Sequence, residues 1–237
     1  MQKHFSILVP FIFCLFLATV SLGMAQDLSQ EEVLAKLEET AASLHDAKFL
    51  LTGKLIDADG TEFPLEVDVQ IIPDMKLARA DFYQPDALAD NFILVDGDGL
   101  YNYIFLTNQA TLLNANDPDA LGGLLGGGGD PGDKPFELNL NLEEIFAGWD
   151  LSIKGYEESP AGNVYVLQFD NVEENVVIHK VEGRVIDGEW HPYSLMFYGE
   201  TDNLMAELIF NDFQTDLNPD PEDLRYMPDD VEIIDER

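Results

Sequence analysis

The stretch Leu65-Glu-Val-Asp-Val-Gln-Ile71 alternates apolar and polar side chains without a break. Successive side chains of a β-strand point to opposite faces of its sheet, so this period of two predicts a strand with one buried face and one wet face. Turn residues at 57–60 precede the stretch, and Pro73-Asp74 follow it. The stretch therefore predicts one strand of an antiparallel sheet whose apolar side chains share a face.

Further short strands are predicted along the rest of the chain, separated by tight turns such as 96–99 and 187–188. They lie at 76–83, 92–95, 100–106, 151–156, 164–169, 176–185, 190–198 and 204–210. No helical period alternates with them, which argues against a parallel α/β fold. We expect a mainly β fold of the α+β class, with a curved antiparallel sheet that is a meander or barrel-like.

Helices are expected at only two places. Ser29 and Glu32 have the spacing of a capping box, and apolar residues then recur at helical spacing as far as His45. A short lid helix is expected at 142–147. Two helices can cover only part of the apolar face, so we expect the rest to line an apolar cavity that suits a greasy ligand. A closed, packed core is the alternative.

The N-terminus has the pattern of a secretory signal peptide at residues 1–25. Lys3 precedes an apolar run, and Gly23 and Ala25 are small residues at the positions that a signal peptidase reads. An uncleaved membrane anchor is the alternative. Cleavage would leave one domain, residues 26–237, in the periplasm or another extracytoplasmic space. It would also remove Cys14, the single cysteine, so no disulfide and no thiolate metal site is expected.

The chain is strongly acidic, with 12 Lys and Arg against 46 Asp and Glu and a net charge of −34. Loss of Lys3 with the signal peptide gives −34 − 1 = −35. This charge argues against nucleic-acid binding and against anionic membrane surfaces, and it favours a monomer. The acidic surface is explained either by adaptation to salt or by docking to basic envelope membrane-protein partners.

A glycine-rich insertion at 114–135 interrupts the strand pattern. It contains seven glycines around three leucines, which are Leu121, Leu124 and Leu125. Such a segment suits either a moving lid over the cavity or a tolerated surface insertion. Both interpretations stay open.

No catalytic constellation is found in the sequence. His45, His179 and His191 do not have the spacing of metal ligands, and no Gly-x-Ser-x-Gly nucleophile motif is present. Carboxylates are too numerous for any one pair to be informative. We therefore predict no catalytic residue, no metal site and no cofactor. An exported hydrolase with an unrecognised site is the competing hypothesis.

Three separated motifs carry a family resemblance. They are Arg79-Ala-Asp-Phe-Tyr-Gln-Pro85, Val95-Asp-Gly-Asp-Gly-Leu-Tyr-Asn-Tyr103 and Pro228-Asp-Asp-Val-Glu-Ile-Ile-Asp235. In this order they resemble motifs of the periplasmic outer-membrane lipoprotein carrier (LolA-like) family. The chain departs from that pattern at Ala80, where an aromatic residue is usual, and at Asp230, which replaces glycine. It also lacks the family's lid-closing arginine before Pro73, and the glycine-rich insertion is foreign to the pattern.

The resemblance implies an unclosed β-barrel that carries acyl chains of lipoproteins or other lipids across the envelope. The alternative is an envelope sensor of the same fold that binds lipid or lipidated polypeptide. Acyl chains would be held by apolar side chains from the helix and several strands. The candidate ligand-binding residues are Leu34, Leu37, Leu65, Val67, Val69, Ile71, Phe82, Tyr101, Tyr103, Leu204, Leu208 and Phe210.

Overall fold

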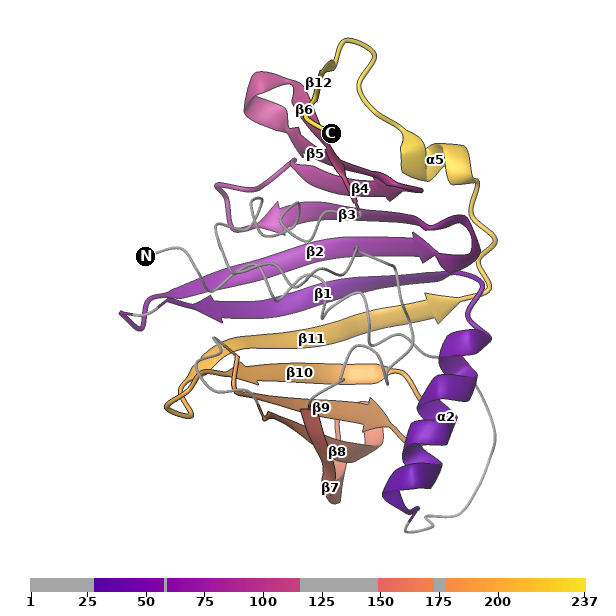
Figure 1. Cartoon of the computed structure of the whole chain (residues 1–237), viewed down its shortest axis with the longest axis vertical. Helices are drawn as coiled ribbons and strands as arrows, with labels where there is room; N and C mark the ends of the chain where they lie inside the picture. The colour runs from indigo at the N-terminus through magenta and orange to yellow at the C-terminus, as the bar shows by residue number, and fades with distance from the viewer. Residues whose placement is uncertain (1–27, 58, 116–148, 173–177) are drawn as a thin grey trace.

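The computed structural model of this chain describes residues 28–57, 59–115, 149–172 and 178–237. Figure 1 shows one large curved sheet with a helix lying across one end of its strands. The expected signal peptide, the expected lid helix at 142–147 and residues 116–135 of the glycine-rich insertion lie outside the described residues.

The sheet has twelve strands in the order β12-β6-β5-β4-β3-β2-β1-β11-β10-β9-β8-β7. Its two ends, β12 and β7, do not pair with each other, so the sheet is an unclosed barrel, as the sequence predicts. The strands are β1 (Ala47–Ile56), β2 (Glu62–Ile72), β3 (Leu77–Gln84), β4 (Phe92–Asp96), β5 (Gly99–Ile104), β6 (Gln109–Asn114), β7 (Trp149–Ser159), β8 (Gly162–Asn171), β9 (Lys180–Ile186), β10 (Pro192–Tyr198), β11 (Leu204–Thr215) and β12 (Glu232–Asp235).

One pair of strands departs from the expected antiparallel pattern. β12 runs parallel to β6, whereas every other neighbouring pair is antiparallel. The reason is the connection: residues 216–231 carry the chain from the middle of the sheet to its edge. β12 then begins where the Glu232 N–H donates to the Asn108 carbonyl at 3.1 Å, at the start of β6.

Helix α2 (Gln30–Ala42) begins at the predicted capping box. The Ser29 hydroxyl accepts the Glu32 N–H at 3.3 Å, and the Glu32 carboxylate accepts the Ser29 N–H at 2.8 Å. The Ser29 N–H and the Ser29 hydroxyl both donate to the Glu32 carboxylate, and these two hydrogen bonds lower the pKa of Glu32. Val33, Leu37 and Ala41 recur on one buried side of the helix and join the main apolar cluster of the sheet.

A second helix, α5 (Pro221–Arg225), lies in the connection to β12 and is not among the elements that the sequence analysis predicts. Asp220 caps it by accepting the Glu222 N–H, and Pro221 occupies its first turn. Two short 3₁₀ turns, η1 (Pro73–Met75) and η2 (Phe105–Thr107), close the β2–β3 and β5–β6 connections.

Candidate functional site: the inner apolar face

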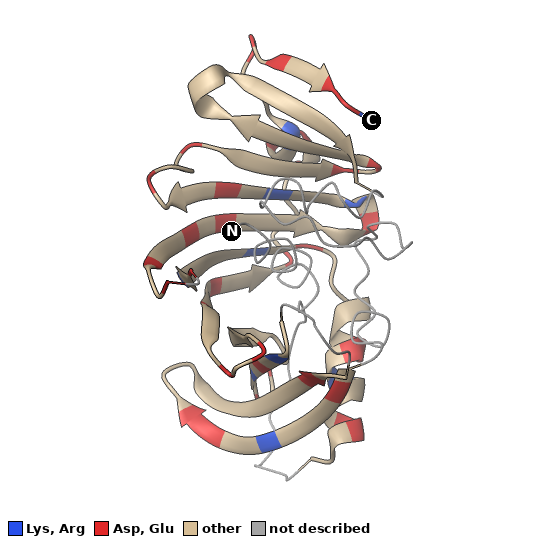
Figure 2. Cartoon of the chain, turned by 60° about the vertical axis from the view of Figure 1, so that its left-hand side comes forward, with Lys and Arg blue, Asp and Glu red and all other residues tan. Residues whose placement is uncertain are grey.

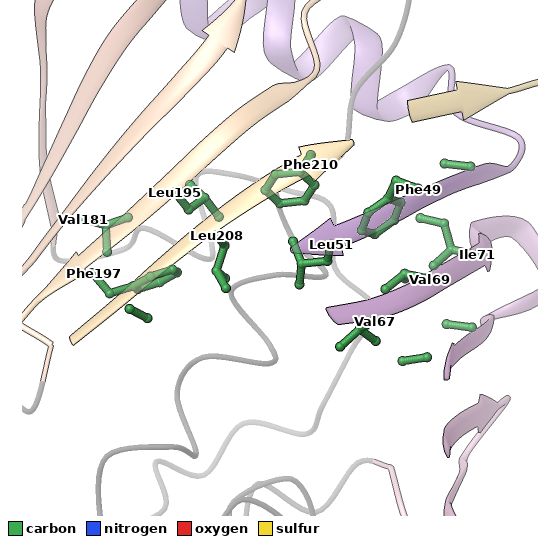
Figure 3. Close-up of a cluster of buried hydrophobic side chains, with 14 of the residues drawn as sticks. Phe49, Leu51, Val67, Val69, Ile71, Val181, Leu195, Phe197, Leu208 and Phe210 are labelled. Atoms are coloured by element: carbon green, nitrogen blue, oxygen red, sulfur yellow. The ribbon is translucent and has the colours of Figure 1, made fainter. Parts of the chain in front are cut away.

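The alternation predicted for Leu65 to Ile71 is present in β2, where every second residue is buried. The neighbouring strands continue it in register: Leu51 of β1 pairs with Val67 of β2 on one side and with Phe210 of β11 on the other. Figure 3 shows these side chains gathered on one face of the sheet, which we call the inner face. The labelled members are Phe49, Leu51, Val67, Val69, Ile71, Val181, Leu195, Phe197, Leu208 and Phe210.

The inner face is uninterrupted from β3 to β8. Phe82 of β3 pairs with Val67, and Leu195 of β10 pairs with Leu208 of β11. Beyond them, Val181 of β9 pairs with Phe169 of β8. All belong to one apolar cluster, Phe82 as a partly buried member at its margin. One alternating pattern, repeated in seven neighbouring strands, therefore produces a single apolar surface.

The inner face carries small side chains on β3. Ala78 and Ala80 of β3 lie between larger neighbours, because Ala80 pairs with Val69 and with Ile93. Gly53 of β1 is a different case, since a side chain there would clash: its φ is +155°, and a Cβ would lie 1.9 Å from the Glu207 carbonyl oxygen. The close approach of β1 and β11 at the centre of the inner face thus requires glycine at this position.

The structure brings together eight of the twelve predicted site residues. Leu37, Leu65, Val67, Val69, Ile71, Leu208 and Phe210 are buried in the inner-face cluster, and Phe82 packs against it. Leu34 and Leu204 are half-buried and belong to neither apolar cluster of the described residues. Residues of the same face that the sequence analysis did not select include Phe49, Leu51, Leu195 and Phe197. Phe49 and Leu51 alternate along β1, and Leu195 and Phe197 along β10, but Leu50 and Gly53 interrupt the pattern of β1.

Tyr101 and Tyr103 lie on the opposite face. They belong with a second cluster, which we call the outer cluster, whose buried members are Leu77, Phe92, Leu94, Tyr103, Ala110 and Leu224. The Tyr103 ring stacks on Phe92 at 4.5 Å between centroids, and its hydroxyl donates to the Asn108 side chain at 3.0 Å. The two tyrosines are therefore separated by the sheet from the other predicted residues.

The outer cluster is covered by the chain's own C-terminal segment, residues 216–237. Arg79 of β3 holds this segment by donating to the carbonyls of Leu224 at 3.2 Å and Tyr226 at 2.7 Å. Its guanidinium also lies 3.8 Å from the centre of the Phe92 ring and pairs with Asp81. Arg225 adds two hydrogen bonds to Asp96, which raise the pKa of Arg225. Two arginines thus fasten the cover of the outer cluster.

The described residues contain no group of three or more His, Cys, Asp or Glu side chains that could hold a metal ion. None of their helices is long and apolar enough to cross a membrane.

A hollow of about 460 Å³ at the ends of β5 and β6 is lined by Asp98, Asn114, Asp235 and Arg237 and is polar, unlike the inner face. On β7, the Tyr156 hydroxyl donates to Asp187 at 2.6 Å, and this hydrogen bond raises the tyrosine's pKa.

Comparisons of the sequence find no matching family model and no matching curated protein. Comparison of the structure finds an uncharacterised conserved protein from Thermus thermophilus, with a TM-score of 0.61, 19% identity, and coverage of 88% of this chain and 99% of that one. Pseudomonas aeruginosa MucB in the MucA/MucB complex matches with a TM-score of 0.50 and 14% identity over 82% of this chain and 60% of that one.

A LolA superfamily protein from Nitrosomonas europaea is a more distant match, with a TM-score of 0.38 and 15% identity over 81% of this chain and 96% of that one. The chain shares the fold of the Thermus thermophilus protein and of MucB, and its unclosed sheet is the architecture that the family resemblance of its sequence motifs implies. At these identities the likeness is one of fold.

Proposed function

We propose that this protein binds acyl chains of lipoproteins or other lipids on its inner face and carries them across the cell envelope. The observation that supports this most is the inner face itself, one apolar surface from β3 to β8 on an unclosed sheet. Burial of a hydrocarbon chain there would contribute roughly 0.8 kcal/mol per CH₂. One acyl chain would then bind usefully but reversibly, as a carrier requires.

The location proposed for this activity is the periplasm or an equivalent extracytoplasmic space, reached through the expected signal peptide. The acidic surface would dock basic patches of envelope membrane proteins, and such docking would weaken as salt rises. No chemical step is part of the proposal.

The test uses Phe82 and its neighbour Tyr83, adjacent residues of β3 with opposite orientations. Phe82 packs at the margin of the inner-face cluster, whereas the Tyr83 side chain is 48% exposed. Delipidated protein is titrated with a fluorescent fatty acid, and protein purified from its own envelope fraction is examined by native mass spectrometry for bound lipid. Phe82→Glu should weaken fatty-acid binding about tenfold or more, because a carboxylate would enter the apolar surface. Tyr83→Glu should leave binding unchanged.

Absence of bound lipid together with absence of fatty-acid uptake would refute the carrier proposal. Equal losses of fatty-acid binding in the two variants would also count against the proposal. The introduced glutamate would then weaken binding through its charge rather than through its position on the inner face.

A second candidate is an envelope sensor that binds a polypeptide. The similarity to MucB, a structure determined in complex with MucA, favours this alternative. Recovery of a lipid-free peptide from the purified protein, with no uptake of fatty acid, would support the sensor over the carrier.

A further inference from the structure

The edge of the sheet at β12 is open. β12 pairs with β6 and, among the described residues, with no other strand, so it ends the sheet at the top of Figure 1. All four of its residues are exposed, and Ile233 and Ile234 are exposed by 51% and 37%. Open edges with apolar side chains are templates for an additional strand.

The register of β12 specifies which backbone groups face outward. The Glu232 N–H donates to the carbonyl of Asn108, just before β6, and the Glu236 N–H donates to the carbonyl of Leu112 within β6. Successive residues of a strand direct their N–H and carbonyl groups to alternate sides, so Ile234 faces β6 together with Glu232 and Glu236. Ile233 and Asp235 therefore present backbone donors and acceptors to the open edge.

The side chains along this edge specify the chemistry of an added strand. On one face stand Glu232, Ile234 and Glu236, and on the other stand Ile233 and Asp235. Residues 229–237 carry five acidic side chains and a single basic one, Arg237, which is paired with Asp235. A matching strand would place Lys or Arg opposite the two glutamates, with an apolar residue between them opposite Ile234.

We propose that the open edge of β12 binds an extended, basic segment of a partner protein as an added strand. Charge complementarity selects this occupant over a second copy of the chain. Two β12 strands side by side would bring acidic side chains together in two chains of net charge −34 each, and like charges across a strand pair are destabilising.

The β5–β6 connection extends the surface at the start of β12. The Asn108 side chain donates to the Asp230 carbonyl at 3.0 Å, which fixes the C-terminal segment beside η2. Phe105 and Leu106 of η2 are exposed by 53% and 88%. They offer apolar contacts to a segment that continues beyond the first residue of the strand.

The probe is the acetylated and amidated peptide Thr-Lys-Val-Val-Val-Lys-Thr, with the same peptide carrying Glu in place of Lys as its control. Binding is measured by fluorescence anisotropy, and its location by amide chemical-shift changes. We expect the lysine peptide to bind and the glutamate peptide not to bind, with the largest changes at 231–237 and 104–108.

Ile233→Pro tests the backbone part of the proposal. Its N–H faces the open edge rather than β6, so proline removes the outward donor and obstructs the edge while leaving the β6 pairing possible. The lysine peptide should bind this variant about tenfold more weakly or worse, whereas Ile233→Ala should lose much less. Fatty-acid uptake should be unchanged in both, which separates this proposal from the carrier function.

The double variant Glu232→Lys, Glu236→Lys tests the side-chain part and should prefer the glutamate peptide. Three results would overturn the proposal: no binding of the lysine peptide, equal binding to Ile233→Pro, or shifts spread over the whole acidic surface. Self-association of the chain through β12 would overturn it as well.

Discussion

The two faces of this sheet both bury apolar side chains, but different parts of the molecule cover them. The outer cluster is closed by the C-terminal segment, with Leu224 inserted into it and Arg79 and Arg225 holding the cover in place. Figure 2 shows this end of the sheet, with the acidic β12 along its edge. The inner face is larger and spans seven neighbouring strands, and α2 supplies side chains to its cluster from one end. One alternating pattern thus yields a sealed core on one side and a candidate binding surface on the other.

The largest expected effect comes from Gly53→Ala, which breaks the inner face at its centre. The new Cβ would lie 1.9 Å from the Glu207 carbonyl oxygen, so β1 and β11 must separate. We expect the free energy of unfolding to fall by about 3 kcal/mol in urea denaturation. Gly60→Ala is the control, because its φ is +84° but nothing lies within 4 Å, and about 1 kcal/mol is expected. Similar losses in the two variants would contradict the close-approach argument.

The next test enlarges one alanine on each face. Ala110 is fully buried in the outer cluster, so Ala110→Phe should overpack it and lower the free energy of unfolding by about 2 kcal/mol. Ala80 lies on the inner face, and Ala80→Phe should cost less stability while reducing fatty-acid uptake. If Ala80→Phe destabilises the protein equally and leaves uptake unchanged, the inner face is a packed core like the outer one.

Arg79→Met should open the cover of the outer cluster and leave the inner face intact. The substitution removes hydrogen bonds to two carbonyls and to Asp81, and we expect a loss of about 2 kcal/mol. Hydrogen exchange should accelerate in α5 and β12, while fatty-acid uptake stays the same. Arg237→Met, which removes only a pair with the exposed Asp235, should leave stability nearly unchanged, because solvent screens an exposed ion pair. Loss of lipid uptake in Arg79→Met would show that the two faces are coupled.

Much of the fold could be predicted from local patterns. The capping box at Ser29 and the alternation at 65–71 predict α2 and β2 correctly, because each pattern reflects one element and its solvent exposure. β1 and β6 were not predicted as strands. Leu50 and Gly53 interrupt the alternation of β1, and β6 ends at Asn114, where the glycine-rich insertion begins.

The choice of face could not be predicted from the same patterns. Alternation places Tyr101 and Tyr103 on one side of β5, but which side becomes the inner face depends on pairing with β4 and β6. The C-terminal segment covers the outer side through the hydrogen bonds of Arg79 with Leu224 and Tyr226. These two residues follow Arg79 in the sequence by 145 and 147 positions. Such long-range contacts leave no local periodicity in the sequence.

The smallest effect is expected on the outer face away from the C-terminal cover, at an ion pair between the half-buried Lys180 and the exposed Asp202. Lys180 of β9 donates to Asp202 at 2.5 Å, which lowers the pKa of Asp202 and raises that of Lys180. A lowered pKa in the folded state means that the Asp202 contribution to stability is complete above its unfolded pKa of about 3.9 and is lost as pH falls through the folded value. The Lys180 contribution is complete below about pH 10.4 and is lost as pH rises through its raised value. In Lys180→Met, carboxyl NMR should show the pKa of Asp202 returning upward, with binding of fatty acid unchanged; an unmoved pKa would mean that the ion pair is not formed in solution.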